Sequence, residues 1–552
     1  MDRKAGWIIN IFFPLLLVGW AQQWHYRWDA THDQRYTLNQ NTTRLLEELS
    51  QPLKIDVFLS GTLPSEYLRL QRETRALIRS MEQHTDRLIV SFIDPFEEAE
   101  STESLIREMN QFGLPPEYVT AQKNQTVAQS VVFPWAIVND GNKTLRIPLL
   151  EKVLGDDGQE KINRSIAQLE YHFFDALFKI TQKQKPTLAV LTSHGCSEAV
   201  KIADLMRSLQ PYYQLASFDL KALEGEDQKT LENLNRFPLL LISNPTEAFT
   251  EKEKFLLDQH LMGGGKQWWA IHPVAINRDS LFNAQGEAMA VARSLNMENA
   301  FFKYGIRLQN NLVQDLYCAP VVLASGAESQ TQYLPYPWPF YPLAKPFQND
   351  LFGGQMGNVL MPFPSAIDTL KNALQKTVLL GSSNFSQSLA TPLNIKLATA
   401  AQKLSTADFD QKSQPMGVLL RGIFSSAFEN RIHPALIEGV KTSGTSEMVV
   451  FSSGSIAENQ VDKGNPLELG YDKWTNNFYS NKIFVQQTIH HLMGNEMLLN
   501  IKNKSLVLPR LDQEKVEQHS PKIKIILLVL PLLILGGLWV GVRRWRKIQY
   551  GQ

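Results

Sequence analysis

The residues whose types and spacing best suit chemistry are Ser193, His194, Gly195 and Cys196, which are adjacent in the chain. A cysteine thiol beside an imidazole could act as a nucleophile with its general base. A hydrolase of that kind also needs a tight turn that presents the nucleophile and a third group that orients the base, and no G-x-S-x-G or comparable pattern is present. We therefore expect a structural turn with no catalytic residue, in which Ser193, His194 and Gly195 are the candidate ligand-binding residues.

The other candidate motifs indicate neither a cofactor nor a metal. The stretch 263–266 reads Gly-Gly-Gly-Lys, but it follows an expected helix and lacks the Ser or Thr that comes after the lysine of a phosphate-binding loop. It is interpreted as the cap at the C-terminal end of that helix. His490 and His491 point about 100° apart on a helix, so they cannot both face one metal ion. We expect no cofactor, no metal site and no ATPase activity in this chain.

The turn at 193–196 is expected to follow a buried parallel strand. Apolar runs alternate with amphipathic runs in this part of the chain, with expected strands at 188–191, 215–218, 239–242 and 268–271 and expected helices at 197–209, 227–235 and 250–262. This alternation is typical of a doubly wound parallel sheet, here of flavodoxin- or amidotransferase-like type. Ligands of such sheets bind at the carboxyl ends of the strands, which is where the turn lies.

The region before this sheet has a different order of elements. Strands are expected at 53–59, 88–93, 131–138 and 145–149, and helices at 39–49, 65–84 and 102–112. A βαβ unit followed by a helix and a hairpin is the order of a thioredoxin-like domain. The redox chemistry of that fold needs a C-x-x-C motif, and this region has no cysteine, so only the fold is expected.

The composition excludes several classes of protein. The chain has 552 residues, a formal net charge of zero and 43% hydrophobic residues. A nucleic-acid-binding protein usually carries a basic excess, so no nucleic acid is expected as a partner. The high hydrophobic content argues against disorder. Two cysteines, Cys196 and Cys318, are too few for a disulfide framework, a Cys-based zinc site or an iron–sulfur cluster.

Both ends of the chain carry apolar runs that could span a lipid bilayer. Residues 525–542 contain no charged side chain and would extend about 27 Å as a helix, close to the thickness of the hydrocarbon core. Residues 6–21 form a shorter run, for which a cleavable signal peptide is the alternative to a retained helix. We favour the retained helix.

The residues that flank these runs indicate an orientation. Trp7, Trp20 and Trp539 are typical of interfacial aromatic anchors, and Arg543 and Arg544 follow the second run. Because basic residues favour the cytoplasmic side, both termini are expected in the cytoplasm of a bacterium. The main body would then lie in the periplasm, anchored to the inner membrane.

The expected organisation has seven parts. They are an N-terminal transmembrane helix (1–22), a thioredoxin-like domain (35–160), a linker helix (161–185), an α/β domain (186–500), a juxtamembrane linker (501–521), a C-terminal transmembrane helix (523–543) and a basic tail (544–552). Within the α/β domain, residues 334–346 hold five prolines and are expected to form a rigid surface loop. The fold class is therefore α/β, multi-domain and membrane-anchored.

Short motifs along the chain carry a family resemblance. They include RYTL at 35–38, LRLQRETR at 68–75, INRS at 162–165, SHG at 193–195, ARSLN at 292–296, YGIR at 304–307, LPYPWP at 334–339 and ELGYD at 468–472. In their order and spacing the chain resembles the gliding-motility-associated ABC-transporter auxiliary subunits of Bacteroidetes, the GldG family. That family usually has Gly-His-Gly-Glu at 193–196 and an acidic Asp-Gly-Asp-like turn at 453–455. This chain has Ser-His-Gly-Cys and Ser-Gly-Ser there, which weakens a catalytic or metal role of either loop.

The resemblance implies a non-enzymatic auxiliary subunit that works with a separate ABC permease and a cytoplasmic ATPase in gliding motility and type IX secretion. Members of the family are often called substrate-binding components, but the resemblance implies no particular substrate. Two alternatives stay open. One is a periplasmic module that binds a glycan, a peptide or a small solute at the 193–196 loop. The other is a membrane-anchored hydrolase that uses Cys196 and His194.

Overall fold

The computed structural model describes residues 37–97, 99–123, 126–151, 158–182, 184–222, 225–282, 286–325, 331–347, 356–402, 404–502 and 513–551. The chain forms two compact units that divide between Ser505 and Leu506, and each is described by itself. The first unit is a mixed α/β structure, and the second holds one long helix. The expected N-terminal helix, with Trp7 and Trp20, lies outside the described residues.

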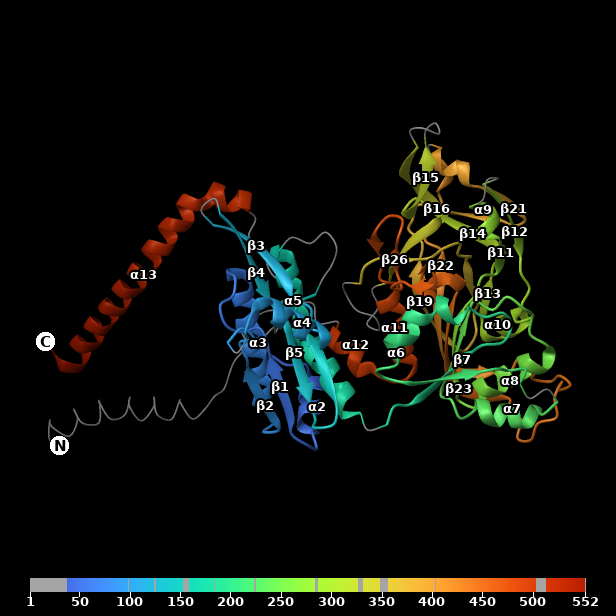
Figure 1. Ribbon diagram of the computed structural model, residues 1–552, viewed down its shortest axis with the longest axis horizontal. Helices are drawn as coiled ribbons and strands as arrows, with labels where there is room; N and C mark the ends of the chain where they lie inside the picture. Colours follow the sequence, from blue (N-terminus) through green and yellow to red (C-terminus); the bar gives the residue numbers. More distant parts are fainter. Residues whose placement is uncertain are drawn as a thin grey trace. The chain divides into compact units, whose positions relative to one another are not determined.

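The N-terminal part of the first unit is built on a four-stranded sheet (Figure 1). Its strands, in spatial order, are β2 (Leu88–Phe92), β1 (Leu53–Val57), β5 (Trp135–Asn139) and β6 (Thr144–Pro148). β1 is parallel to β2 and antiparallel to β5, and β5 and β6 form a hairpin. The remaining elements of this part are α2 (Gln40–Glu47), α3 (Ser65–Glu82), α4 (Thr102–Gln111), β3 (Glu117–Lys123), β4 (Thr126–Val132) and α5 (Gly158–Thr181).

Helix α5 packs on two cores. Leu169, Phe173 and Leu177 belong to the core of the four-stranded sheet, whereas Phe174 belongs to the core of the larger sheet that follows. Residues at i and i+4 lie on one side of a helix, so the adjacent Phe173 and Phe174 reach different neighbours. The helix between the two parts therefore contributes apolar surface to both.

A larger mixed sheet organises the rest of the first unit. Its strands are β7 (Thr187–Leu191), β8 (Gln214–Phe218), β9 (Leu239–Ser243), β10 (Lys266–Ala270), β15 (Cys318–Ser325), β16 (Gln332–Pro346), β17 (Val359–Leu360), β19 (Gln375–Gly381), β22 (Pro415–Ser425) and β23 (Ser443–Phe451). The spatial order is β15-β16-β19-β22-β23-β10-β9-β7-β8, with β17 paired to β16. β8, β7, β9, β10 and β23 are parallel, and the pairs beyond β23 are antiparallel.

Helices cover both faces of the parallel strands (Figure 1). α6 (Ala203–Leu209) and α11 (Asn481–Leu492) pack on one face, and α7 (Asp227–Leu234), α8 (Glu251–Met262) and α10 (Glu298–Tyr304) pack on the other. Trp268 and Trp269 are adjacent on β10, point to opposite faces and are both fully buried. A strand that is buried on both faces has a continuous apolar sequence, which is why these strands were recognisable.

The first unit also contains shorter strands and α-helices. They are β11 (Val274–Ile276), α9 (Arg278–Leu281), β12 (Glu287–Ala292), β13 (Ile306–Leu308), β14 (Asn311–Asp315), β18 (Ile367–Thr369), β20 (Ser386–Ala390), β21 (Leu393–Lys396), β24 (Val461–Asp462), β25 (Asn465–Pro466), β26 (Tyr471–Asp472), β27 (Asn477–Phe478) and α12 (Glu496–Lys502). Side chains from β11, β12, β14, β15, β16 and β21 form an apolar core around Trp338.

The proline-rich stretch 334–346 is part of a strand, so the prediction of a surface loop is wrong. It lies within β16, which pairs antiparallel with β15. Trp338 at its centre is fully buried, and Phe340 is 5% exposed. The stretch therefore supplies two of the largest side chains in its core, which a surface loop would not do.

The spacing of the prolines explains how a strand tolerates them. Pro335, Pro337 and Pro339 alternate, so their missing N–H groups all face the same edge of β16. Pro335 and Pro337 lie opposite residues of β15 and cannot donate to them, so their nitrogens turn toward the other edge. Among the described strands, partners on that edge begin only at Leu343. The prediction of a loop was wrong because it used the number of prolines and did not consider their alternate spacing.

The glycines at 263–265 end helix α8, as predicted. The N–H of Gly263 donates to the carbonyl of Gln259 at 2.8 Å, and Gly264 has a φ of 95°, in the left-handed region. That conformation suits glycine at the end of a helix. Lys266 then opens β10, so the lysine begins a strand and not the helix of a phosphate-binding loop.

The second unit contains helix α13 (Gln513–Tyr550). Its segment Leu527–Ile548 is, among the described residues, the one helix long and apolar enough to cross a membrane, judged by length and composition. Its apolar side chains are exposed, and Trp539 is 63% exposed with the Arg543 guanidinium 5.1 Å from its ring centre. This helix is consistent with a membrane anchor.

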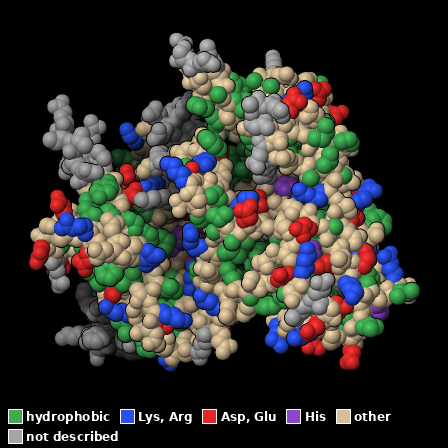
Figure 2. Space-filling model, turned by 45° about the vertical axis from the view of Figure 1, so that its right-hand side comes forward, with side chains coloured by type: hydrophobic (Ala, Val, Ile, Leu, Met, Phe, Trp, Pro, Cys, Tyr) green, Lys and Arg blue, Asp and Glu red, His purple; other side chains and the backbone are tan. Residues whose placement is uncertain are grey.

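Charged side chains of both signs are interspersed on the face of the molecule in Figure 2. Exposed ion pairs among the described residues include Lys303 with Glu429 at 2.9 Å. Exposed pairs of this kind contribute at most about 1 kcal/mol each. They therefore bear on solubility more than on the choice of fold.

Candidate functional site

The carboxyl ends of the parallel strands form the edge at which a site is expected. β7 ends at Leu191, β9 at Ser243, β10 at Ala270 and β23 at Phe451. β8 lies on one side of β7 and β9 on the other, so the chain reverses its direction across the sheet between β7 and β9. Ligands of open α/β sheets bind at such a switch point. The loop at 193–196 leaves β7 there.

The backbone of this loop is a tight turn held by the loop that follows β9. His194 and Gly195 have positive φ values of 61° and 59°. This backbone is unfavourable for a residue with a Cβ, and the His194 carbonyl partly offsets it by accepting hydrogen bonds from the N–H groups of Thr246 (2.9 Å) and Glu247 (3.0 Å). A Cβ on residue 195 would lie 2.0 Å from Oγ1 of Thr246, so glycine is required there.

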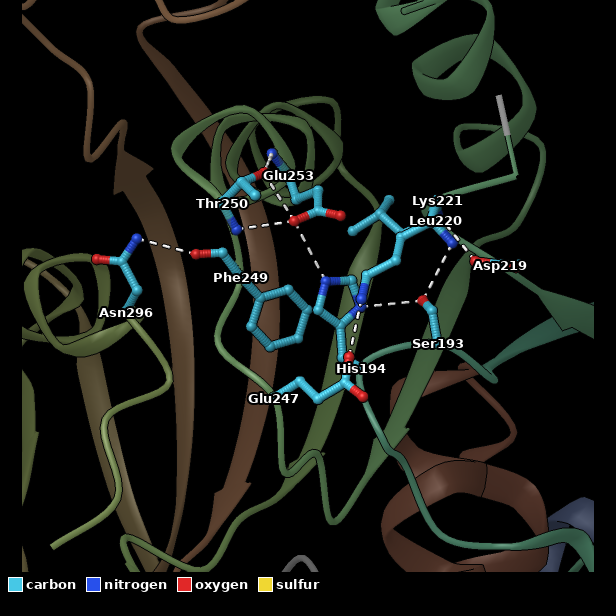
Figure 3. Close-up of polar contacts among 10 residues, drawn as sticks. All are labelled: Ser193, His194, Asp219, Leu220, Lys221, Glu247, Phe249, Thr250, Glu253 and Asn296. Atoms are coloured by element: carbon cyan, nitrogen blue, oxygen red, sulfur yellow. Dashed lines mark hydrogen bonds and ion pairs between the residues drawn. The ribbon is translucent and has the colours of Figure 1, made fainter. Parts of the chain in front are cut away.

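The side chain of His194 is buried against the start of α8 (Figure 3). Its Nε2 lies 3.2 Å from Oε2 of Glu253, and its Nδ1 lies 3.0 Å from Oγ of Ser193. The ring stacks on Phe249 with 4.1 Å between ring centres and 15° between planes. Burial lowers the pKa of His194 and outweighs the attraction of the Glu253 carboxylate. His194 is 1% exposed, and its contacts hold the loop against α8.

Glu253 is itself held by the capping box of α8. Oγ1 of Thr250 accepts a hydrogen bond from the Glu253 N–H at 3.3 Å, and Oε2 of Glu253 accepts one from the Thr250 N–H at 2.7 Å. Burial acts to raise the pKa of Glu253, but the hydrogen bonds from Thr250 and the contact with His194 lower it overall. One carboxylate oxygen thus serves both the helix cap and His194.

The two remaining residues of the loop have structural contacts as well. Oγ of Ser193 accepts a hydrogen bond from the N–H of Leu220 at 3.2 Å. Burial raises the pKa of Cys196 to about 12, so its thiol is protonated at neutral pH. Because a thiol nucleophile needs a lowered pKa, this environment argues against catalysis by Cys196.

Replacing His194 with glutamine should make the protein less stable and less sensitive to acid. We expect a loss of about 1–3 kcal/mol at neutral pH, because the Glu253 oxygen loses its contact with His194 and keeps only Thr250, and Phe249 loses its stacked ring. The folded-state pKa of His194 lies below the ordinary value of 6.5, so the unfolded chain binds more protons as the pH falls below that value, and wild-type stability should decrease. The variant should lose less stability over the same interval.

The measurement is urea denaturation of both proteins on either side of about pH 6.5. His433→Gln is the matched control, since His433 also stacks on a phenylalanine, the buried Phe255, but is itself exposed. An unchanged pH dependence in His194→Gln would show that this ring does not titrate on unfolding.

A second loop meets the same sheet edge from the end of β23. The turn Ser453-Gly454-Ser455 packs against the loops that follow β9 and β10, because a Cβ on residue 454 would lie 2.3 Å from Oδ1 of Asn244 and 2.8 Å from Cδ2 of His272. Oγ of Ser455 lies 3.0 Å from Nε2 of His272. The two loops singled out in the sequence, at 193–196 and 453–455, therefore lie on one edge of the sheet.

Glu458 connects these loops. Its Oε1 accepts hydrogen bonds from Oγ of Ser197 at 2.8 Å and from Nδ2 of Asn244 at 3.0 Å. Ser197 belongs to the segment after β7, Asn244 follows β9, and Glu458 follows β23. A single carboxylate thus joins the ends of three parallel strands.

A cavity of about 990 Å³ opens beside this carboxylate. Its walls include Asn244, His272, Ser455 and Glu458 from the sheet edge and Arg293 from the loop after β12. Aromatic side chains from β16 and from the β26–β27 hairpin complete the walls. Its size is that of a site for a small organic molecule. Ser193, His194 and Gly195 are not among its lining residues, so their contact with a ligand remains a prediction.

Sequence reasoning missed most of the residues that line this cavity. A signal existed for two of them: Asn244 comes directly after the apolar run 239–242, and His272 directly after 268–271. The rule that directed attention to the end of β7 applies equally to these strand ends. Glu458 and Arg293 gave no such signal, because neither directly follows a recognisable parallel strand.

The described residues contain no group of three or more His, Cys, Asp or Glu side chains placed to hold a metal ion. His490 and His491 are both buried on α11. Nδ1 of His490 lies 2.6 Å from the hydroxyl of Tyr213, which is a structural contact inside the core.

Comparison with known proteins gives two family matches. A family model described as an ABC-type uncharacterized transport system matches residues 185–488, more than half of the chain, and a domain of unknown function (DUF7088) matches residues 32–139. The first match covers the large sheet and the cavity. Among curated proteins, none matches.

One solved structure with some similarity is the mmIFT52 N-terminal domain. It is 13% identical, and the alignment covers 56% of this chain and 97% of that chain, with a TM-score of 0.31.

Proposed function

Because the chain belongs to the family described as an ABC-type uncharacterized transport system, we propose that it is a non-enzymatic auxiliary subunit of an ABC transporter. The match over residues 185–488 is the observation that carries this proposal. The permease and the cytoplasmic ATPase are separate chains in this proposal, since the one glycine-rich stretch that could suggest nucleotide binding ends a helix. Hydrolysis of ATP by the partner moves the body of this subunit or changes its contacts.

The apolar helix α13 anchors the subunit beside the permease. Its segment Leu527–Ile548 has the length and composition of a membrane span. Arg543 and Arg544 near its end support a cytoplasmic C-terminus, with the body in the periplasm of a bacterium. The run at 6–21 is the second span of this proposal and brings the N-terminus to the same side.

The finer assignment is to gliding motility and type IX secretion. Its support is the resemblance of the ordered motifs to the gliding-associated subunits of Bacteroidetes. In this assignment the N-terminal part is a thioredoxin-like domain without redox function, supported by the strand order β2-β1-β5-β6, and the second part is a doubly wound, flavodoxin- or amidotransferase-like domain.

Affinity purification of the tagged full-length chain from membranes in a mild detergent, followed by mass spectrometry, tests the subunit proposal. We expect a permease and an ATPase in amounts comparable to the bait. The control replaces residues 527–542 with an unrelated apolar helix of equal length, which keeps the anchor and the basic residues after it but removes helix-specific contacts, and it should recover less permease. Recovery of the wild-type chain without either partner would contradict the proposal.

A second candidate function is a solute-binding module anchored to the inner membrane. The cavity at the ends of the parallel strands is the observation that favours it. Calorimetry of the purified chain against cell-wall fragments and sugars tests this candidate. Heat of binding that saturates would support it, and no heat with any of them would count against a glycan ligand.

A further inference from the structure

Arg293 is placed in the wall of the cavity by its backbone. It follows β12, and its N–H donates to the carbonyl of Pro273 at 2.7 Å, which joins it to the loop between β10 and β11. Two residues later, Leu295 donates its N–H to Glu298, which starts α10. Arg293 therefore stands on a fixed segment between a strand and a helix, with its side chain among the lining residues of the cavity.

The charge of Arg293 has no counterion in the described part of the chain. No carboxylate there forms an ion pair with its guanidinium, although the side chain is partly buried. Burial is the cause that lowers the pKa of Arg293, with no acidic neighbour opposing it. The other two basic residues of the wall differ, because Lys201 pairs with Glu198 at 2.9 Å and Lys473 pairs with Asp462 at 3.0 Å.

A partly buried cation without a counterion raises the free energy of the folded protein, and binding of an anion lowers it again. Taking a charge out of water without a partner costs free energy, and an incoming anion recovers that cost as binding energy. A guanidinium holds a carboxylate or a phosphate through two parallel N–H donors, which gives direction as well as strength. Arg293 thus favours an oxyanion over a neutral group of the same shape.

The rim of the same cavity carries exposed aromatic side chains. Tyr333 is 73% exposed, Trp474 is 67% exposed and Phe282 is 51% exposed, and all three line the cavity. Large aromatic rings that stay in contact with water offer flat apolar surface to a ligand that has such surface of its own. The rim therefore complements a flat or apolar body, while Arg293 complements a charged end.

We propose that this cavity binds a small amphipathic organic anion, with a carboxylate or phosphate on Arg293 and an apolar body against the aromatic rim. The proposal does not depend on the transporter role, because it concerns binding by this chain alone. It also names a ligand chemistry that neither the family match nor the sequence assigns.

Isothermal titration calorimetry on the full-length chain in lipid nanodiscs tests the proposal. The probes are phenyl phosphate and phenylacetate as aromatic anions, inorganic phosphate as an anion without a ring, and benzyl alcohol as a ring without charge. We expect saturable binding of one or both aromatic anions and weaker binding of the other two probes. Preference for phenyl phosphate or for phenylacetate identifies the oxyanion.

Three variants separate the contribution of Arg293 from an effect on folding. Arg293→Gln should weaken binding of the aromatic anion by about tenfold or more, and Arg293→Lys should retain part of it. Arg307→Gln is the matched control, because Arg307 lies on β13 in an exposed pair with Asp368 and should bind as the wild type does. Thermal melting of each variant checks that it is folded.

Equal binding by Arg293→Gln and the wild type would overturn the proposal, as would equal affinity for benzyl alcohol and the anions. The absence of saturable binding by every probe would also overturn it. None of these results bears on copurification with a permease, so this proposal and the transporter proposal can fail independently.

Discussion

Replacing Asp258 with alanine should destabilise the protein by about 3–5 kcal/mol, because it leaves several buried donors without an acceptor. The carboxylate of Asp258 accepts hydrogen bonds from the hydroxyl of Tyr304 (2.8 Å), from Oγ of Ser426 (2.7 Å) and from the N–H of Ala427 (2.7 Å). These donors come from α10 and from the turn after β22, so one side chain on α8 joins three elements. Burial raises the pKa of Asp258, so the donors do not fully offset the loss of water.

Urea denaturation of the full chain in detergent, monitored by circular dichroism, measures the effect. Glu232→Ala is the control, because Glu232 lies on α7 and accepts an exposed hydrogen bond from Nε2 of Gln228 at 2.8 Å. The free energy of unfolding of Glu232→Ala should stay within about 0.5 kcal/mol of the wild-type value. A loss below about 1 kcal/mol in Asp258→Ala would mean that water enters and replaces the carboxylate.

Replacing Trp269 with alanine should cost about 3–5 kcal/mol through the cavity that it leaves. The ring is fully buried between the sheet and its helices, 5.8 Å from the ring centre of Phe249 and 5.4 Å from that of Phe301. Its Nε1 donates to Oε1 of Gln267 at 3.0 Å, so the variant also leaves that oxygen without its donor. Because Phe249 packs on the ring of His194, the amides of the 193–196 loop should also become less protected from hydrogen exchange.

Two measurements distinguish these effects. Chemical denaturation gives the loss of stability, and hydrogen exchange of the Cys196 amide reports on the loop. Trp269→Phe should recover part of both effects, and Trp474→Ala, at a ring that is 67% exposed, should change neither by much. Wild-type exchange at the loop in a destabilised Trp269→Ala protein would show that the loop does not depend on this packing.

Sequence patterns predicted the parallel strands and parts of β19 and β22, but not β15 and β16 at the antiparallel end of the sheet. β9 and β10 are buried on both faces, so each shows an unbroken apolar run that has no other simple explanation. β16 shows no such run, because its prolines alternate with aromatic residues and only one edge of that part of the strand is paired. β16 is recognisable as a strand from its pairing with β15, and the sequence pattern does not predict that pairing.

The candidate site was also predictable only in part. The end of β7 was predictable as the position of a turn, but its positive φ values at His194 and Gly195 were not predicted. The burial of His194 was not predictable, since it depends on Phe249 and Glu253, which reach it from the other side of a switch point. Arg293 could not be predicted either, because its significance is that no carboxylate of the described residues forms an ion pair with it, and its neighbours in sequence do not indicate this.

The strand order has a consequence for how the chain is made. β10 borders β9, which precedes it closely in the chain, and β23, which begins only at Ser443. While the ribosome is still producing the residues between them, one edge of β10 has no partner, and the Trp268 face lacks the cover of α11, which ends at Leu492. Non-local pairing of this kind folds slowly and leaves apolar surface exposed in the meantime. The nascent chain therefore keeps the Trp268 face without its α11 cover until α11 is complete at Leu492 of 552 residues.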